Sequence, residues 1–257
     1  MSSTPTFTPE LPWLEPGDPF PPVERAWGPN DPAPGLLAAG GALDVDTLLR
    51  AYGQGIFPWY SAGQPILWWC TDPRMVLRTQ QFRLHRSLRK TLTRLLQEQR
   101  LVLRLDHDFE RVIRACAHMP RRGQTGTWIL PPMIQAYQQL HAAGHAHSVE
   151  AWIDGELAGG LYCVNLGAMV FGESMFSRRS DASKLAMCGL VAFCLAHGIP
   201  LIDCQQDTSH LASLGATLMS RADFSRHLHK TTSHNAPVWR FEPVYWNHLI
   251  TGSDAPA

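Results

Sequence analysis

Apolar and polar residues in the second half of the chain change from helical spacing to alternation and back. A helix is expected over residues 131–143, and Gly144 suits the left-handed conformation that follows many helices. The next segments read as an antiparallel meander of three strands, over residues 148–153, 156–165 and 168–175. A helix capped by Asp181 and a short apolar strand over 199–204 then follow. This order predicts a mixed sheet in an α/β (α+β) domain.

The first half of the chain is less regular. Residues 1–34 are rich in proline, which predicts an irregular arm on the surface. A short helix opened by Asp44 or Asp46 precedes an aromatic turn at Phe57-Pro58-Trp59-Tyr60. We therefore expect four parts: an arm (1–34), a small N-terminal domain (35–80), an acyltransferase-like catalytic domain (81–235) and a tail (236–257).

The net charge of zero conceals an uneven distribution. Residues 1–48 hold seven acidic residues and one arginine, whereas residues 74–104 hold nine basic residues and one glutamate. Within the basic segment, leucines recur at helical spacing while cationic side chains form another stripe. A solvated charged face is the ordinary explanation of such a helix. The shortage of acidic partners instead favours contacts to a nucleic-acid backbone, made by Arg83, Arg86, Arg89, Lys90 and Arg94.

Polar groups interrupt the apolar second domain at two places. Glu173 lies in the middle of a hydrophobic strand, where a carboxylate is costly unless it is paired or used. Asp203 and Gln205 end another strand two positions apart, so both side chains are expected on one face. A structural hydrogen-bond network and a small reaction site remain equal alternatives from spacing alone.

Other chemistries have weaker support. The spacing of the six cysteines does not match a metal-binding motif. We expect them to be buried and reduced, as in a protein of a reducing compartment. Cys204 with His210 as its base is a minor alternative, as is a metal at His145 and His147. The sequence has no phosphate-cradling glycine loop and no membrane-spanning apolar run, and its first forty residues lack a basic start followed by an apolar run. We expect a soluble cytoplasmic protein without a metal or cofactor.

Several segments in fixed order resemble the leucyl/phenylalanyl-tRNA–protein transferase family over roughly residues 35–228. The matching segments include Gly53-Gln54-Gly55-Ile56-Phe57-Pro58-Trp59-Tyr60, Trp68-Trp69 with Asp72-Pro73-Arg74, Gly126-Thr127-Trp128-Ile129, Gly172-Glu173-Ser174-Met175-Phe176-Ser177-Arg178, Leu201-Ile202-Asp203-Cys204-Gln205 and Ala212-Ser213-Leu214-Gly215-Ala216. The resemblance implies a C-terminal domain like the acyl-CoA N-acyltransferases. The glycine-rich pyrophosphate loop of that fold is missing at residues 178–184, which argues against acyl-CoA as donor.

The resemblance also implies the reaction. Leucine or phenylalanine, with methionine as a further donor residue, would pass from aminoacyl-tRNA to the N-terminal Arg or Lys of a protein and create an N-end rule degradation signal. It implies that Trp59 and Trp128 contact the terminal adenosine and that Glu173, Asp203 and Gln205 form the catalytic group. The amino-acid pocket would be apolar, formed by Leu161, Val170, Met175, Met187, Leu190 and Ile202.

We expect the catalytic group to manage protons only, because the donor ester is already activated. In this hypothesis Asp203 accepts a hydrogen bond from the Gln205 side-chain amide, and the Gln205 carbonyl polarises the attacking amine. Glu173 would hold the donor's ammonium group or its sugar hydroxyls. Two alternatives stay open: an acyl-CoA-dependent N-acyltransferase of the same fold, and a non-catalytic RNA-binding module.

Overall fold

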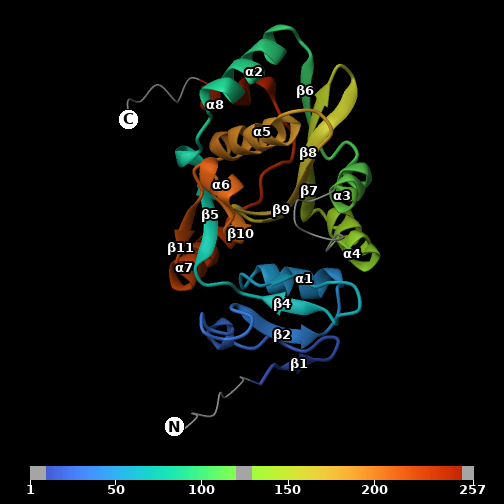
Figure 1. Ribbon diagram of the computed structural model, residues 1–257, viewed down its shortest axis with the longest axis vertical. Coiled ribbons are helices and arrows are strands. Elements are labelled where there is room, and N and C mark those ends of the chain that lie inside the picture. The colour runs from blue at the N-terminus through green and yellow to red at the C-terminus, as the bar shows by residue number, and fades with distance from the viewer. Residues whose placement is uncertain (1–9, 120–128, 251–257) are drawn as a thin grey trace, which may run out of the picture.

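The computed structural model describes residues 10–119 and 129–250. Two sheets organise this part of the chain, a small N-terminal sheet and a larger mixed sheet (Figure 1). None of the described helices is long and apolar enough to cross a membrane.

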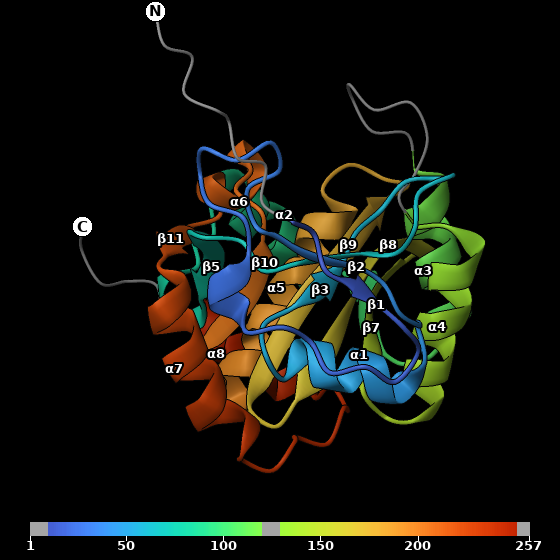
Figure 2. The same ribbon diagram turned by 90° about the horizontal axis from the view of Figure 1, so that it is seen from below.

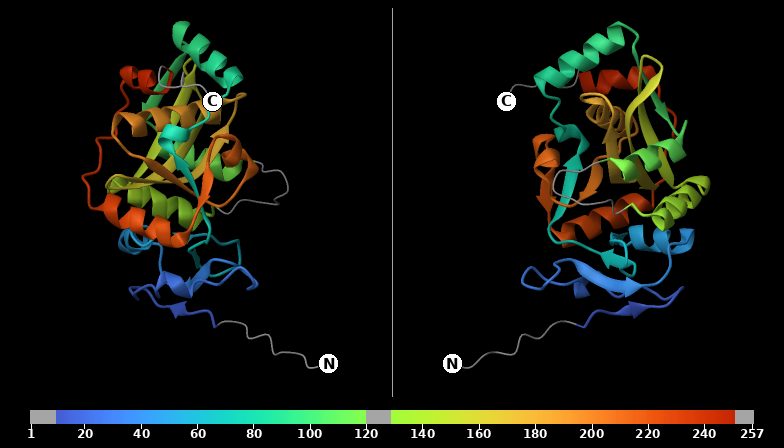
Figure 3. Two further views of the ribbon diagram at one scale, coloured as in Figure 1. Left: turned by 90° about the vertical axis from the view of Figure 1, so that its left-hand side faces the viewer. Right: turned by 45° about the vertical axis from the view of Figure 1, so that its right-hand side comes forward.

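The small sheet has four strands in the order β1-β2-β4-β3. Its strands are β1 (Trp13–Leu14), β2 (Leu36–Gly40), β4 (Leu67–Trp69) and β3 (Phe57–Pro58). Helix α1 (Val45–Tyr52) begins where the Asp44 carboxylate accepts the Thr47 backbone N–H at 2.8 Å, as the sequence predicts. The rest of the arm from residue 10 is irregular apart from a short 3₁₀ turn, Val23–Arg25. Figure 3 shows this sheet as a separate layer beneath the larger domain.

The larger sheet has seven strands in the order β11-β5-β10-β9-β8-β7-β6. In chain order they are β5 (Arg74–Arg78), β6 (Leu101–Leu105), β7 (Ala146–Ile153), β8 (Glu156–Leu166), β9 (Met169–Ser177), β10 (Leu201–Gln205) and β11 (Thr217–Met219). Strands β9 and β10 are parallel and the other neighbouring pairs are antiparallel, which confirms the predicted mixed sheet and meander. The chain passes from the small sheet to the larger one between Trp69 and Arg74. This transition lies before the domain boundary that the sequence predicts near residue 80.

Helices cover both faces of the larger sheet. They are α2 (Arg86–Gln97), α3 (Phe109–His118), α4 (Pro131–Ala142), α5 (Ala182–Ala196), α6 (Ser209–Ser213), α7 (Arg221–Thr232) and α8 (Trp246–Ile250), with 3₁₀ turns at Thr79–Gln81 and Pro243–Tyr245. Helix α5 packs on one face, whereas α3, α4 and the N-terminal domain lie on the other (Figure 2). Each face has its own buried apolar cluster, so residues that alternate along one strand belong to different cores.

The sequence predicts a capping residue at the end of α4 and another at the start of α5. Gly144 follows α4 with φ +81°, as its expected capping role requires. Asp181 is the N-cap residue of α5, as expected, but its side chain makes no capping hydrogen bond. Its carboxylate pairs with Lys184 at 2.9 Å, and the Ser183 backbone N–H donates to the Ser177 hydroxyl at 3.2 Å instead.

The described part of the tail packs onto the larger domain. The Trp239 ring stacks on His147 at a centroid distance of 4.0 Å, and its indole N–H donates to the Asn165 side-chain oxygen at 3.2 Å. The His147 imidazole also bonds the Asp106 carboxylate at 2.7 Å. These contacts give His147 a structural role at the start of β7.

Candidate active site

The site lies where the parallel strands β9 and β10 stop pairing. Their register covers only Ile202 opposite Val170 and Asp203 opposite Phe171. Beyond this point side chains join the two strands, because the Gln205 side-chain amide donates to the Glu173 carboxylate at 2.7 Å. The structure thus brings together two of the residues that the sequence singles out.

Glu173 is surrounded by hydrogen-bond donors from three parts of the fold. The Tyr52 hydroxyl of α1 donates to its carboxylate at 2.7 Å, and the Tyr137 hydroxyl of α4 donates at 3.1 Å. Burial raises the pKa values of both tyrosines, so these hydroxyls keep their protons at neutral pH. Burial also raises the pKa of Glu173 to about 7, although the hydrogen bonds from Tyr52, Gln205 and Tyr137 oppose the shift. The carboxyl group therefore titrates in the range that suits a proton acceptor.

Gln205 is held in an unusual backbone conformation. Its φ is +62°, in the left-handed region, and the pairing of β10 with β5 shifts register between Asp203 and Gln205. The Asp203 carboxylate accepts the Gln205 backbone N–H at 2.9 Å, and the Thr71 hydroxyl donates to the Gln205 backbone oxygen at 3.2 Å. The expected bond from the Gln205 side-chain amide to Asp203 is wrong, because that amide bonds Glu173.

Asp203 is buried in a two-point ion pair with Arg74. The Arg74 Nε and Nη2 donate to its two oxygens at 2.9 and 2.7 Å, with exposed side-chain fractions of 1% and 0%. The guanidinium lies between the rings of Phe57 and Phe224, 4.8 Å from each centroid. Asp203 therefore acts on the site through Gln205.

A cavity of about 190 Å³ opens beside this group. Its walls come from the β3 segment and from the end of β10 with the start of α6, and its lining residues are Phe57, Pro58, Trp59, Glu173, Cys204, Gln205, Gln206, Thr208 and Leu211. Trp59 is braced by Trp69, whose indole N–H donates to the Trp59 carbonyl at 2.7 Å. The predicted adenosine contact Trp59 thus borders the cavity, while the other one, Trp128, lies outside the described residues.

Cys204 also lines the cavity without the features of a nucleophile. Burial raises the pKa of its thiol, and the weak hydrogen bond that the thiol makes is to the Ile202 carbonyl at 3.8 Å. The minor alternative of a cysteine nucleophile finds no support in this environment.

The six residues expected to form the apolar pocket lie together, but on the α5 face of the sheet. Leu161, Val170, Met187, Leu190 and Ile202 are buried in the core there, and Met175 packs against it partly exposed. None of them lines the cavity beside Glu173. Their role in holding the donor's side chain stays a prediction.

The basic helix is confirmed as α2 over Arg86–Gln97, with Leu88, Leu92 and Leu95 buried. Arg83, Arg86, Lys90 and Arg94 are exposed, and Arg89 is partly buried where it donates to the Ile250 carbonyl at 2.9 Å. Helix α2 lies at the end of the molecule opposite the N-terminal sheet (Figure 1). Its first turn is joined to α6 by the bond between His85 and the Ser213 carbonyl at 2.7 Å, and α6 borders the cavity through Leu211.

Sequence reasoning alone does not identify Tyr52, Tyr137 or Arg74 as parts of the site. Tyr52 reads as an apolar position of a short helix, and Tyr137 lies inside another helix. Arg74 carries a usable signal, because it starts a buried strand directly after an Asp-Pro pair. A cation at such a position needs a buried anion.

The chain is similar to known proteins over most of its length. A family model described as leucyl/phenylalanyl-tRNA protein transferase matches residues 76–229, and a model of that family's N-terminal domain matches residues 41–72. The chain is 61% identical over 241 residues to the leucyl/phenylalanyl-tRNA–protein transferase of Polaromonas sp., with 94% of each chain covered. It is 57% identical over 251 residues to that of Albidiferax ferrireducens, with 98% of each covered. Among solved structures, L-PGS from Bacillus licheniformis aligns with a TM-score of 0.38 and 11% identity, covering 79% of this chain and 65% of that one.

Proposed function

This chain belongs to the leucyl/phenylalanyl-tRNA–protein transferase family, and we propose that the Glu173–Gln205 pair is where it joins leucine or phenylalanine to the N-terminal Arg or Lys of an acceptor protein. The observation that carries the proposal is a carboxyl group with a pKa of about 7 hydrogen-bonded to an amide on the wall of a cavity. The product would carry a new N-terminal residue that serves as a degradation signal. The reaction belongs in the cytoplasm, where charged tRNA is available.

The chemistry requires one bond to form and one to break. The acceptor's α-amine attacks the ester carbon of the aminoacyl-tRNA, a C–N bond forms, and the bond from that carbon to the ribose oxygen breaks. The amine loses a proton and the ribose hydroxyl gains one. Because an α-amine has a pKa of about 7.7–8.0, a useful fraction is neutral near pH 7.5, and positioning supplies much of the remaining rate.

Each polar residue has a distinct part in this proposal. Gln205 turns its amide N–H toward Glu173, which leaves the amide oxygen to accept a hydrogen bond from the attacking amine. Glu173 in its ionised form accepts the proton that the nitrogen loses. Asp203 is a positioning residue, since it holds the Gln205 backbone and does not line the cavity.

The tRNA would reach the cavity along α6 and α2. Trp59 offers an aromatic face for the terminal adenosine at the mouth of the cavity. The exposed cations of α2 then contact backbone phosphates farther from the aminoacyl end, with Arg89 directed to the tail.

The acceptor's cationic side chain needs an acidic partner near the cavity. Asp207 is exposed, and its neighbours Gln206 and Thr208 both line the cavity. Within residues 10–119 and 129–250 it forms no ion pair. We assign Asp207 the recognition of the acceptor's Arg or Lys.

The assay for this function uses labelled phenylalanyl-tRNA and two peptides that differ only in an N-terminal Arg or Met. We expect label on the Arg peptide alone. Asp207→Asn should raise the KM for the Arg peptide several-fold with little change in the affinity for tRNA. Equal labelling of both peptides would reject the acceptor specificity, and an unchanged KM would remove Asp207 from it.

The rate should depend on pH through Glu173. Its ionised form accepts the proton, so transfer should increase as pH rises through about 7. The acceptor's own amine contributes a second rise near pH 7.7–8.0. Single-turnover rates between pH 5.5 and 9 should show both rises in the wild-type protein and only the second in Glu173→Gln. A wild-type profile with only the higher transition would contradict a proton-accepting Glu173.

A further inference from the structure

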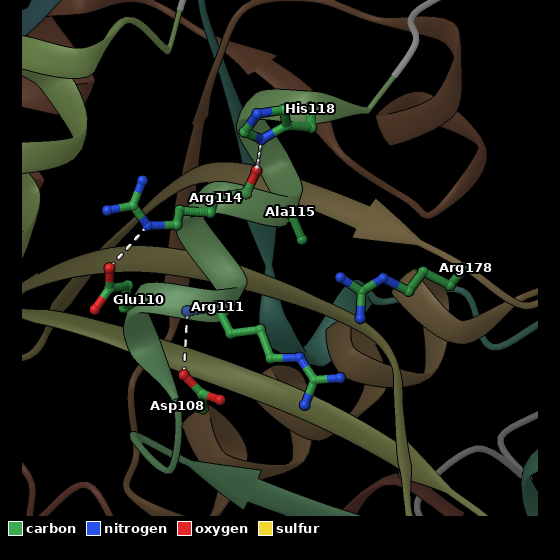
Figure 4. Close-up of a pocket in the computed structure, with 7 residues that line it drawn as sticks. All are labelled: Asp108, Glu110, Arg111, Arg114, Ala115, His118 and Arg178. Atoms are coloured by element: carbon green, nitrogen blue, oxygen red, sulfur yellow. Dashed lines mark hydrogen bonds and ion pairs between the residues drawn. The ribbon is translucent and has the colours of Figure 1, made fainter.

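A second hollow lies along α3, away from the cavity at Glu173. Its volume is about 410 Å³, and its lining residues are Asp108, Glu110, Arg111, Arg114, Ala115, His118 and Arg178 (Figure 4). All of these except Arg178 come from α3 and the residue before it, and Arg178 follows the last residue of β9. The cavity at Glu173 uses none of them.

The acidic residues of this hollow already have partners. The Glu110 carboxylate pairs with Arg114 at 2.8 Å. Asp108 caps α3 by accepting the Arg111 backbone N–H at 3.1 Å. These two carboxylates therefore leave the Arg111 and Arg178 side chains without an ion pair among the described residues.

The Arg111 and Arg178 guanidinium groups face the same open space and point toward each other (Figure 4). Both rest against aromatic rings, Arg111 at 5.6 Å from the Trp152 centroid and Arg178 at 5.3 Å from that of Phe176. The one hydrogen bond found for the Arg178 side chain in the described structure is long, 3.4 Å to the Leu157 carbonyl. Two such groups suit a planar or tetrahedral oxyanion between them.

The hollow is placed at the same sheet edge as the reaction site. Strands β9 and β10 are parallel, so their carboxyl ends reach one edge, with Gln205 at the end of β10. Strand β9 continues past Glu173, and Arg178 follows five residues later, a distance of about 17 Å along an extended chain.

We propose that Arg111 and Arg178 bind backbone phosphates of the donor tRNA a few nucleotides from its aminoacylated end. A stacked strand rises about 3.4 Å per nucleotide, so a separation of about 17 Å is within reach of the same bound RNA. This surface is distinct from the cations of α2. The proposal rests on the proposed function, because the charged end must lie beside Glu173 for the neighbouring phosphates to reach α3.

The test compares two donors in the full-length protein. One is phenylalanyl-tRNA and the other is phenylalanyl-adenosine, which carries the same ester without a phosphate. In the double variant Arg111→Gln/Arg178→Gln, the Kd for the tRNA should rise roughly 10-fold or more. The slope of log Kd against log salt concentration should decrease by about 1.4, because two phosphate contacts are lost. Transfer from phenylalanyl-adenosine to the Arg peptide should keep its wild-type rate.

Two controls make the result specific. Arg111→Lys/Arg178→Lys keeps the charges and should retain most of the affinity and the salt slope. Arg100→Gln removes an exposed arginine that already pairs with Asp154 and Glu98, and it should change neither. An unchanged Kd and salt slope in the glutamine double variant would overturn the proposal, as would loss of transfer from phenylalanyl-adenosine. Failure of the wild-type protein to use phenylalanyl-adenosine would instead count against the proposed reaction site.

Discussion

Glu173→Gln is expected to lower the single-turnover rate of transfer by about 10²–10⁴-fold, the usual contribution of a positioned proton acceptor. Glutamine keeps the size of the side chain and an oxygen for the Tyr52 hydroxyl, but it cannot take up a proton. Binding of the charged tRNA should stay within a few-fold of wild type, because Glu173 is one of many groups along the bound RNA. The measurement is transfer of labelled phenylalanine to the Arg peptide with enzyme in excess.

Glu156→Gln provides the matched control, since Glu156 is exposed at the start of β8 and borders neither hollow. Its transfer rate should equal that of the wild-type protein. If Glu173→Gln kept the wild-type rate, another group would have to accept the proton, and the role of Glu173 would be only structural.

Arg74→Met is expected to destabilise the fold by about 3–5 kcal/mol, because it leaves the Asp203 carboxylate buried without its cation. The transfer rate should fall as well, since Asp203 then loses the contact that orients it toward the Gln205 backbone. The free energy of unfolding in urea measures the first effect, and single-turnover transfer at low temperature measures the second.

The double variant Arg74→Met/Asp203→Leu separates stability from positioning. It removes both charges and should recover much of the lost stability without recovering the rate, because Gln205 lacks its carboxylate partner. Arg100→Met is the surface control and should cost less than about 1 kcal/mol. A double variant with a wild-type rate would show that the ion pair does not position Gln205.

Helices and strands whose apolar residues recur with a clear helical or strand period could be predicted from the sequence. The meander after Gly144, the helix that follows it and the strand ending at Gln205 all have a buried face that their own residues define. Edge strands β6 and β11 have only alternating or short patterns, and α3 and α7 are amphipathic segments with many charges. Their place depends on partners far along the chain.

In the candidate site, too, some residues can be predicted from the sequence and others cannot. Glu173 and Gln205 can be singled out because polar groups on buried strands are rare. Their partners cannot, since Tyr52 and Tyr137 come from two helices that meet only in the folded molecule. The side-chain alternation of a strand does not show which of its faces opens to a cavity, so the pocket role of the apolar residues on the α5 face rests on the family resemblance alone.

The most direct test of the account is a structure of the protein bound to a stable phenylalanyl-adenosine analogue in which an amide replaces the ester. The analogue's carbonyl carbon is expected to lie in the cavity lined by Glu173, Gln205 and Trp59, with room for an amine about 3–3.5 Å away on the Gln205 side. An analogue whose carbonyl lies outside this cavity, with Glu173 and Gln205 beyond hydrogen-bond reach of the incoming amine, would contradict it.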